Sequence, residues 1–344
     1  MKRRNLLTAG IAVAALSLSL TGCTTAGSGT SSTAAGASAT AHGPKNGKNY
    51  VFGDIAYDMK DVWNEYSTEA FTFAGKSVGV QTIVLDSQNS LETSVSQMQA
   101  LIAKNVDGIS VFPISPEQAG TLGKMANAAG IPITFENTTP ALDKSKYISI
   151  VGAQYDQIGE AAMNYIAKTY PGAKVLFVAG TQGGGVYESY QAGIDRALTK
   201  LGGAVTIVST VHGNWETALS MNVTANAIQA GTKFDVVFAN SELMAKGVKN
   251  ALVQAGLNVP IIATGGGPDG LKMIQDGELT ATMSAPVSLQ GLITFRNLYQ
   301  SVVEGKTPEK STALPIIPVD KATLGKAISW TDDAAALKYI GGIK

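Results

Sequence analysis

Two of the three tryptophans stand among polar residues, in segments that could bind a small polar ligand. Trp63 lies in the run DVWNE (61–65), and Trp215 lies in the run HGNWE (212–216). An indole offers a flat apolar face to the C–H groups of a polyhydroxylated ligand, while carboxylates and amides can hydrogen-bond its hydroxyls. The alternative is that both tryptophans are half-buried packing residues, and composition alone favours that interpretation.

Catalytic chemistry finds less support in the sequence. Cys23 is the only cysteine, no G-x-S-x-G run occurs, and His42 and His212 are the only histidines. Asp58 and Asp61 could in principle do acid–base work, but nothing in the sequence indicates perturbed pKa values. We therefore expect a protein that is not an enzyme and holds no metal and no cofactor, with His212 as a structural histidine.

The glycine-rich run at 180–185 follows a predicted strand and precedes a predicted helix, as phosphate-binding loops do. No Lys-Ser or Lys-Thr pair follows Gly185, and neither this run nor 265–267 is a G-x-G-x-x-G motif in a first βα turn. Both runs are therefore interpreted as flexible turns.

The composition is that of a globular protein. The chain has 344 residues, of which 45% are hydrophobic and 15% charged, with 26 basic and 26 acidic residues. A length of about 150 residues per domain predicts two domains. The balanced charge offers no electrostatic footprint for nucleic acid, and a single cysteine excludes an internal disulfide.

The N-terminus resembles a bacterial lipoprotein signal. Three basic residues precede a short apolar run, and the motif LTGC ends at Cys23. We predict a signal peptide over 1–22 and lipidation of Cys23. We also predict a disordered tether over 23–46, because residues 24–41 are all Thr, Ser, Ala or Gly and have no large apolar side chain to bury. Cleavage would leave a net charge of −3 and an extracytoplasmic protein anchored to the cell membrane, at the cell surface or in the periplasm.

From residue 50 the chain alternates β-rich runs with segments of helical period. Ten strands are predicted, at 51–55, 81–85, 108–112, 132–135, 148–151, 175–179, 205–211, 236–239, 261–264 and 280–284. Repeated β-α-β order requires crossover connections, so it predicts an α/β fold of doubly wound parallel sheets. Ligands of such folds bind outside the carboxyl ends of the strands.

Several ordered runs resemble one known family. They are VLDSQN (84–89), KMAN (124–127), GIPI (130–133), VFAN (237–240), GGPDG (266–270) and DGEL (276–279). Over roughly 49–319 the chain is similar to the ribose- and arabinose-type periplasmic sugar-binding proteins, the substrate-binding components of ABC importers. The resemblance implies two Rossmann-like lobes joined by a three-segment hinge, the type I periplasmic binding protein fold. The N-terminal lobe would comprise 47–153 plus 286–314, and the C-terminal lobe 154–285 plus 315–344.

The resemblance also implies ligand contacts. In the first lobe these fall on Tyr57, Asp61 and the stacking ring Trp63, followed by Asn64. The family's acidic position after the fourth strand falls on Glu136.

Asn137 stands beside Glu136. In the second lobe the family's stacking aromatic falls on Trp215, so the two tryptophans would sandwich the ligand.

The second lobe departs from the family at several ligand positions. Glu188 stands where the family has an arginine, and Ser241 replaces an asparagine, with Asn240 one residue earlier. Gly265 and Ala285 replace two further polar residues. Ribose itself is therefore doubtful. Glu188 would disfavour an acidic ligand and could favour a cationic or more hydrogen-bond-donating one.

The resemblance implies a monomeric, lipid-anchored binding protein that captures a small neutral sugar or polyol for delivery to an ABC permease. Alternatives are a binding protein for a nucleoside, a furanose signal or an amine, and a sensor lipoprotein not coupled to import. A surface hydrolase would need a catalytic pair that the sequence lacks. A related repressor would carry a basic helix-turn-helix where this chain has its signal sequence.

Overall fold

The structure is a computed structural model that describes residues 47–141 and 145–344. The predicted signal peptide, Cys23 and the predicted tether lie outside the described residues. Within the described part, no helix is both long and apolar enough to cross a membrane. The same residues contain no group of three His, Cys, Asp or Glu side chains that could hold a metal ion.

Six strands form the first sheet, in the spatial order β11-β5-β4-β3-β1-β2, and every neighbouring pair is parallel. The strands are β1 (Val51–Ala56), β2 (Gln81–Asp86), β3 (Gly108–Val111), β4 (Ile133–Glu136), β5 (Ile150–Gly152) and β11 (Ser311–Ala313). In β1 the buried side chains of Phe52 and Ile55 belong to different core clusters. Side chains alternate between the faces of a strand, so both faces of this sheet are covered.

The second sheet has the order β12-β10-β9-β8-β6-β7. Its strands are β6 (Ala173–Ala179), β7 (Val205–His212), β8 (Val236–Ala239), β9 (Ile261–Gly265), β10 (Ala281–Ser284) and β12 (Ile317–Asp320). All neighbours are parallel except β12, which runs antiparallel to β10. A sheet with one antiparallel edge strand is common in doubly wound folds.

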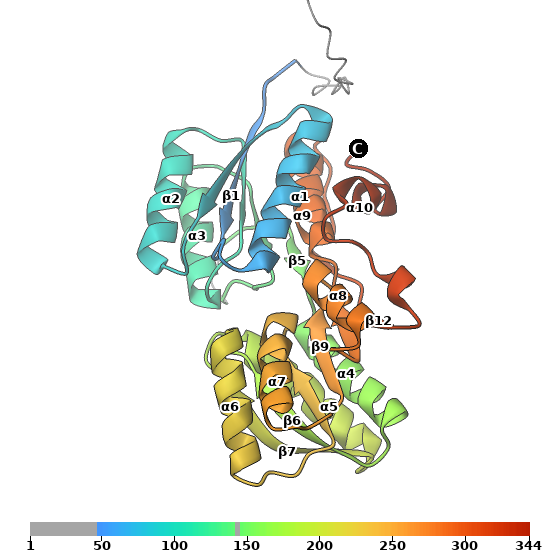
Figure 1. Ribbon diagram of the computed structural model, residues 1–344. Helices are drawn as coiled ribbons and strands as arrows, with labels where there is room; N and C mark the ends of the chain where they lie inside the picture. Colours follow the sequence, from blue (N-terminus) through green and yellow to red (C-terminus); the bar gives the residue numbers. More distant parts are fainter. Residues whose placement is uncertain (1–46, 142–144) are drawn as a thin grey trace, which may run out of the picture. The chain divides into compact units, whose positions relative to one another are not determined.

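Helices cover both faces of each sheet (Figure 1). On the first sheet, α1 (Val62–Val78), α9 (Val287–Val302) and α10 (Asp333–Tyr339) share one core cluster, while α2 (Leu91–Ala103) and α3 (Pro116–Ala128) share another. On the second sheet, α4 (Tyr155–Thr169) and α5 (Val186–Leu201) lie on one face. The other face carries α6 (Thr217–Gln229), α7 (Glu242–Gln254) and α8 (Pro268–Asp276). We call each sheet with its helices a lobe, and the doubly wound α/β prediction is confirmed.

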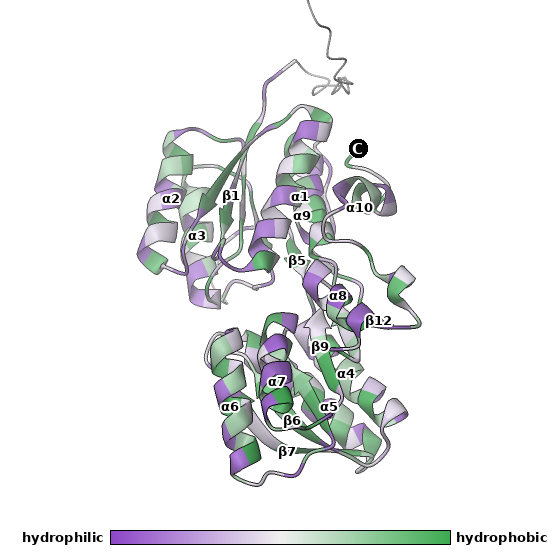
Figure 2. Cartoon of the chain, in the orientation of Figure 1, coloured by the Kyte–Doolittle hydropathy of each residue, from purple (hydrophilic) through white to green (hydrophobic). Residues whose placement is uncertain are grey.

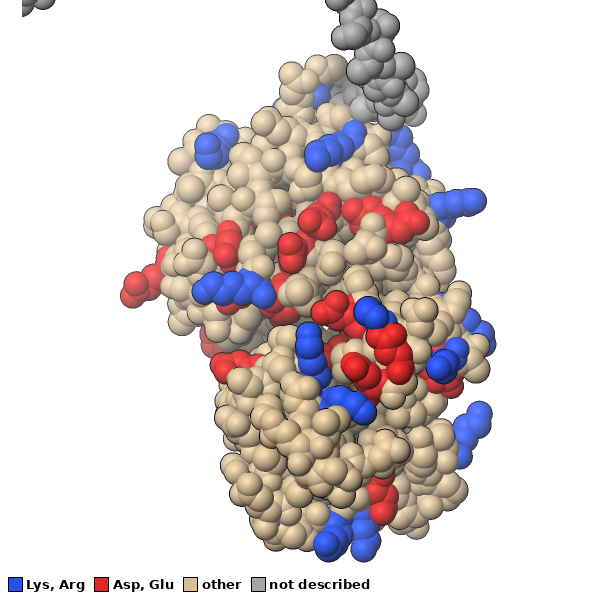
Figure 3. All heavy atoms as spheres, viewed as in Figure 1, with Lys and Arg blue, Asp and Glu red and all other residues tan. Residues whose placement is uncertain are grey.

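Hydropathy follows this layering. In Figure 2 the strands are largely hydrophobic, whereas the helices carry hydrophilic residues between hydrophobic ones. On the face seen in Figure 3, basic and acidic side chains are interspersed, and no continuous basic surface covers it.

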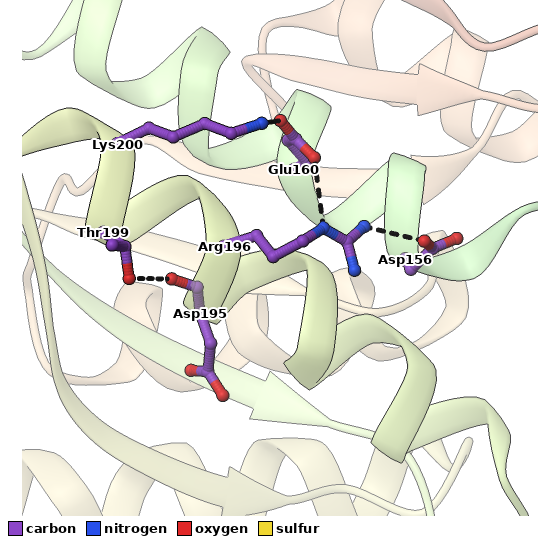
Figure 4. A network of polar contacts seen from close by, with 6 residues as sticks. All are labelled: Asp156, Glu160, Asp195, Arg196, Thr199 and Lys200. Carbon is purple, nitrogen blue, oxygen red and sulfur yellow. Dashed lines mark hydrogen bonds and ion pairs between the residues drawn. The ribbon is translucent and has the colours of Figure 1, made fainter.

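Ion pairs join the exposed sides of α4 and α5 (Figure 4). The Arg196 guanidinium lies 2.7 Å from Asp156 Oδ2 and 3.6 Å from Glu160 Oε2. Lys200 Nζ lies 2.6 Å from Glu160 Oε1. Arg196 and Lys200 are exposed and their carboxylate partners are partly exposed, so these pairs contribute little to the stability of the fold.

The chain passes from one sheet to the other after β5, after β10 and between β11 and β12, where the three hinge segments were predicted. A short 3-10 helix, η1 (Leu324–Lys326), follows β12. The chain then returns to the first lobe, where Ala336 and Ile343 join the core with α1 and α9. The predicted assignment of all of 315–344 to the second lobe is therefore corrected, because α10 buries its apolar side chains in the first.

Candidate ligand-binding site

The turn between β1 and α1 holds the predicted ligand residues Tyr57 and Asp61, and the first turn of α1 holds Trp63 and Asn64. Asn64 is buried, and its Oδ1 accepts a hydrogen bond from the Tyr57 backbone N–H at 3.2 Å. Asp61 caps α1, and its Oδ1 accepts from the Trp63 N–H at 3.1 Å. Asn64 therefore shapes the turn that carries Tyr57, while Asp61 fixes the start of the helix that carries Trp63.

Two ionisable groups of this turn, Asp61 and Tyr57, have raised pKa values. Desolvation raises the pKa of Asp61 above its usual range, although the carboxyl still reaches solvent. Burial, with the nearby Asp58 and Asp61 carboxylates, raises the pKa of Tyr57. The phenol is therefore a neutral hydroxyl at physiological pH, able both to donate and to accept a hydrogen bond.

The Trp63 ring is held by two neighbours that the sequence did not reveal. Its Nε1–H donates to Gln290 Oε1 at 3.3 Å. The ring of Trp330 meets it edge-on, with centroids 5.3 Å apart and planes at 86°. Tyr66 contacts Trp330 from the same helix as Trp63, so three aromatic rings form one cluster at the start of α1.

Glu136 lies inside the first lobe, at the end of β4. Its carboxylate accepts from Ser67 Oγ at 3.0 Å, from Ser110 Oγ at 3.3 Å and from Gln290 Nε2 at 2.6 Å. The Glu136 side chain is almost fully buried, and its carboxylate is bonded to these three protein donors.

Asn137, the next residue, has φ of 56° and bridges Gln290 to the first hinge segment. It donates from Nδ2 to Gln290 Oε1 at 2.8 Å and accepts the Ala153 N–H at 2.8 Å through Oδ1.

A second buried carboxyl, Asp54 in β1, is electrostatically coupled to Glu136. Burial and the proximity of Glu136 raise the pKa of Asp54 well above its usual range. Burial also raises the pKa of Glu136, but its hydrogen bonds to Gln290, Ser67 and Ser110 favour the charged form. Burial therefore disfavours the charged form of both carboxyls, and the hydrogen bonds to Glu136 oppose that effect more than the single Ser110 bond to Asp54 does.

In the second lobe, Trp215 lies three residues beyond β7 with a positive φ of 67°. Its backbone N–H points to Met244 Sδ at 3.3 Å, and its ring packs against Gly180, where any Cβ would overlap the indole. The glycine at 180 is therefore required by the close approach of the ring, which places Trp215 beside the carboxyl end of β6.

Asn240 and Ser241 follow β8 and shape the same edge. Asn240 Oδ1 accepts the Gly180 N–H at 3.0 Å, while its Nδ2 is buried without a protein partner. Ser241 caps α7 by accepting the Met244 N–H at 3.2 Å. An unpaired buried amide donor costs free energy unless a water or ligand pairs with it, so Asn240 Nδ2 is available to pair with an acceptor at this edge.

The Glu188 side chain is exposed, and its carboxylate is bonded to backbone groups of its own turn. Its carboxylate accepts the N–H groups of Gly183 at 2.7 Å and Gly185 at 2.9 Å, closing the glycine turn onto the start of α5. Desolvation acts to raise the pKa of Glu188, but these backbone donors outweigh it and hold the pKa below its usual range. His212, whose Nδ1 lies 2.7 Å from the Gly180 carbonyl oxygen, also favours the charged form. Both side chains therefore organise the turn.

Glu242, the first residue of α7, is a further site group that the sequence analysis missed. Its buried carboxylate accepts the N–H groups of Gly266 at 2.6 Å and Gly267 at 3.0 Å, and the Thr282 hydroxyl at 2.6 Å. Gly265 and Gly266 have φ of 137° and 88°, values that L-residues rarely adopt. The glycine turn after β9 is thus wrapped around this carboxylate, close to where the resemblance placed a polar residue at Gly265.

The predicted residues therefore fall into two groups, each near the carboxyl ends of the parallel strands of one sheet. Those of the first lobe are Tyr57, Asp61, Trp63, Asn64, Glu136 and Asn137, and those of the second are Glu188, Trp215, Asn240 and Ser241. Trp63 also packs against the core cluster of the second lobe that contains Ala153 and Ala285. Carboxyl strand ends are where doubly wound folds bind ligands.

Comparison with known proteins agrees with this architecture. A family profile described as "Periplasmic binding protein domain" matches residues 52–307. The ribose import binding protein of Bacillus subtilis is 25% identical over 242 residues, covering 70% of this chain and 77% of that protein. The xylitol-binding protein of Mycolicibacterium smegmatis is 28% identical over 233 residues, covering 67% and 66%.

Solved structures share the fold. The Caulobacter myo-inositol binding protein bound to myo-inositol superposes with a TM-score of 0.75 at 23% identity, covering 82% of this chain and 96% of the other. A galactofuranose binding protein gives a TM-score of 0.75 at 21% identity, covering 83% and 99%. The two-lobed type I fold defines a class of solute-binding proteins. The chain belongs to the periplasmic binding protein family, which confirms the predicted family and fold.

Proposed function

We propose that this protein is an extracytoplasmic solute-binding protein that captures a small neutral sugar or polyol and delivers it to an ABC permease. The observation that supports the proposal most directly is the placement of Trp63 and Trp215 at the carboxyl ends of different sheets, each held by its own packing partners. In this proposal the two indoles enclose one ligand between the lobes.

The polar groups near the rings fit a neutral polyol. Tyr57 offers a neutral hydroxyl, Asp61 offers a carboxylate, and Asn240 offers an unpaired amide donor. A micromolar dissociation constant needs about −8 kcal/mol. Hydrogen bonds to charged groups of about 1.5 to 3 kcal/mol each, with two stacked rings, can supply this after ordering costs.

The ligands named for four of the relatives and solved structures support a neutral ligand. Ribose, xylitol, galactofuranose and myo-inositol are uncharged and rich in hydroxyls. Glu188, which could have favoured a cationic ligand, already accepts two backbone N–H groups. A neutral ligand is therefore the better proposal than an amine.

The cellular setting is proposed from the sequence. The basic start, apolar run and LTGC motif support cleavage before Cys23 and lipid anchoring there. We expect a monomer on the outer side of the cell membrane, working with a permease in that membrane. Metabolic labelling with an alkyne fatty acid should mark the protein and fail to mark Cys23→Ala.

Thermal unfolding against pentoses, hexoses, sugar alcohols, inositols, nucleosides and amines tests the ligand class. A ligand at 100 times its dissociation constant should add about 2.7 kcal/mol of stability, which is several degrees. A response confined to sugars or polyols supports the proposal. A response confined to amines, nucleosides or furanose signals would replace the ligand class, and silence throughout would favour a sensor not coupled to import.

Two substitutions test the stacking rings. Trp63→Ala or Trp215→Ala should weaken binding by about 2 kcal/mol or more, as loss of buried aromatic anchors does. Tyr339→Ala is a matched control, because it removes an exposed ring on α10 outside the site. Parental affinity in both tryptophan variants would contradict the sandwich.

A further inference from the structure

The Gln290 side chain, on α9, is completely buried and has all of its hydrogen-bonding capacity occupied. Its Nε2 group donates to Glu136 Oε2 at 2.6 Å and to Ser67 Oγ at 3.3 Å. Its Oε1 accepts from Trp63 Nε1 at 3.3 Å and from Asn137 Nδ2 at 2.8 Å. An amide has two donors and two acceptor sites, so none remains for another partner.

The orientation of this amide is determined by its neighbours. Glu136 Oε2 also accepts from Ser67 Oγ, so it faces the donor end of the Gln290 amide. Trp63 Nε1 can only donate, and Asn137 must present its Nδ2 because its Oδ1 already accepts the Ala153 N–H. If the amide were flipped, its NH₂ group would meet the N–H groups of Trp63 and Asn137, and its oxygen would meet the Glu136 carboxyl oxygen.

Two contacts, one with Gln290 and one with Trp330, therefore fix the orientation of the Trp63 ring. The bond to Gln290 lies along Nε1, and Trp330 packs edge-on against the ring. Trp330 is itself buried, on the C-terminal stretch beyond the matched family domain, which ends at residue 307. A ring held in this way keeps its orientation without ligand, so less ordering entropy is lost when ligand binds.

We propose that Gln290 is a positioning residue of the binding site, whose buried amide fixes the Trp63 indole and so sets its stacking face before ligand arrives. The inference rests on the proposed function, because it concerns the same site. It also identifies a chain of contacts from Glu136 through Gln290 and Asn137 to the hinge residue Ala153.

The ring can be observed without any ligand. The chain has three tryptophans, so the ¹⁵N-labelled protein should show three indole N–H resonances, and Trp63→Phe identifies one of them by its loss. Gln290→Met should shift the Trp63 indole resonance and accelerate its exchange with solvent. Asn297→Leu is the matched control, because it removes another buried amide from α9, bonded to Ser149 Oγ at 2.9 Å. An unchanged Trp63 resonance in Gln290→Met would overturn the inference.

A double-mutant cycle tests the effect on binding, by titration calorimetry with D-ribose, xylitol and myo-inositol in parallel. Gln290→Met should weaken binding about tenfold in the Trp63 background and less than about twofold in the Trp63→Phe background, since phenylalanine has no N–H to lose. Equal losses in both backgrounds would overturn the inference, because Gln290 would then act through general stability. Asn297→Leu should change neither affinity.

Two further outcomes are distinguishable. If Gln290→Met does not fold, Gln290→Asn withdraws the amide by one methylene and should give the same pattern at smaller size. If the parent protein binds none of the wider solute panel, the proposed function fails, while the indole resonances still decide whether Gln290 positions Trp63.

Discussion

Glu242→Gln should change how the stability of the protein depends on pH. Burial raises the pKa of the Glu242 carboxyl from 4.5 to about 7, and Asp269 adds to the rise. The three donors to this carboxylate, from Gly266, Gly267 and Thr282, act in the opposite direction and do not overcome burial. The folded state therefore holds a proton near neutral pH that the unfolded state has already released.

The sign follows from proton linkage. A carboxyl whose pKa is higher in the folded state contributes stability that is fully present below the unfolded pKa. That contribution is lost as pH rises from about 4.5 to about 7. A full rise of this size corresponds to up to about 3 kcal/mol. Glutamine has nearly the same shape and does not titrate, so the Glu242→Gln variant should not lose this stability as pH rises.

Urea unfolding of the parent and Glu242→Gln from pH 5 to pH 8 measures the effect. The stability of the variant relative to the parent should improve by about 2 to 3 kcal/mol across this range. Glu278→Gln removes an exposed carboxylate that is not bonded to the Gly266–Gly267 turn, so it should not reproduce that change. A constant difference between Glu242→Gln and the parent at all pH values would refute the argument.

Three further substitutions have defined outcomes. Gly180→Ala should displace the Trp215 ring, because the new Cβ overlaps the indole, and should weaken sugar binding at least about tenfold by calorimetry while the protein stays folded. Arg196→Ala should cost less than about 1 kcal/mol in urea unfolding, and less again at high salt, because its ion pairs are exposed. Phe295→Ala should cost about 3 to 5 kcal/mol, because the fully buried ring packs at the centre of the first-lobe core; a loss under 1 kcal/mol would contradict that packing.

Much of the fold could be predicted from sequence because most of the strands are apolar runs between helices of clear period. All ten predicted strands exist, with ends within two residues of the predicted ones. The strands β11 and β12 were not predicted, since three or four residues at a sheet edge carry too little alternation to detect. The helix α10 is only seven residues long, and only its tertiary contacts show which lobe it joins.

Local sequence indicated only part of the candidate site. The polar surroundings of Trp63 and Trp215 pointed to both rings, whereas positions such as Ser241 came from the family resemblance. Gln290 gave no such signal, because its partners come from α1 and β4 through the return of α9 to the first sheet. Glu242 was missed because its partners are backbone groups of a turn 24 residues later.

Titration calorimetry of the purified protein with neutral polyols tests the central claim most directly. The account predicts that at least one of D-ribose, xylitol and myo-inositol, or a close stereoisomer, binds one to one with a dissociation constant in the micromolar range or below. It also predicts a negative heat-capacity change, because both tryptophan faces would be buried. Absence of binding to every sugar and polyol at millimolar concentration, in protein whose cooperative unfolding shows it to be folded, would contradict the account.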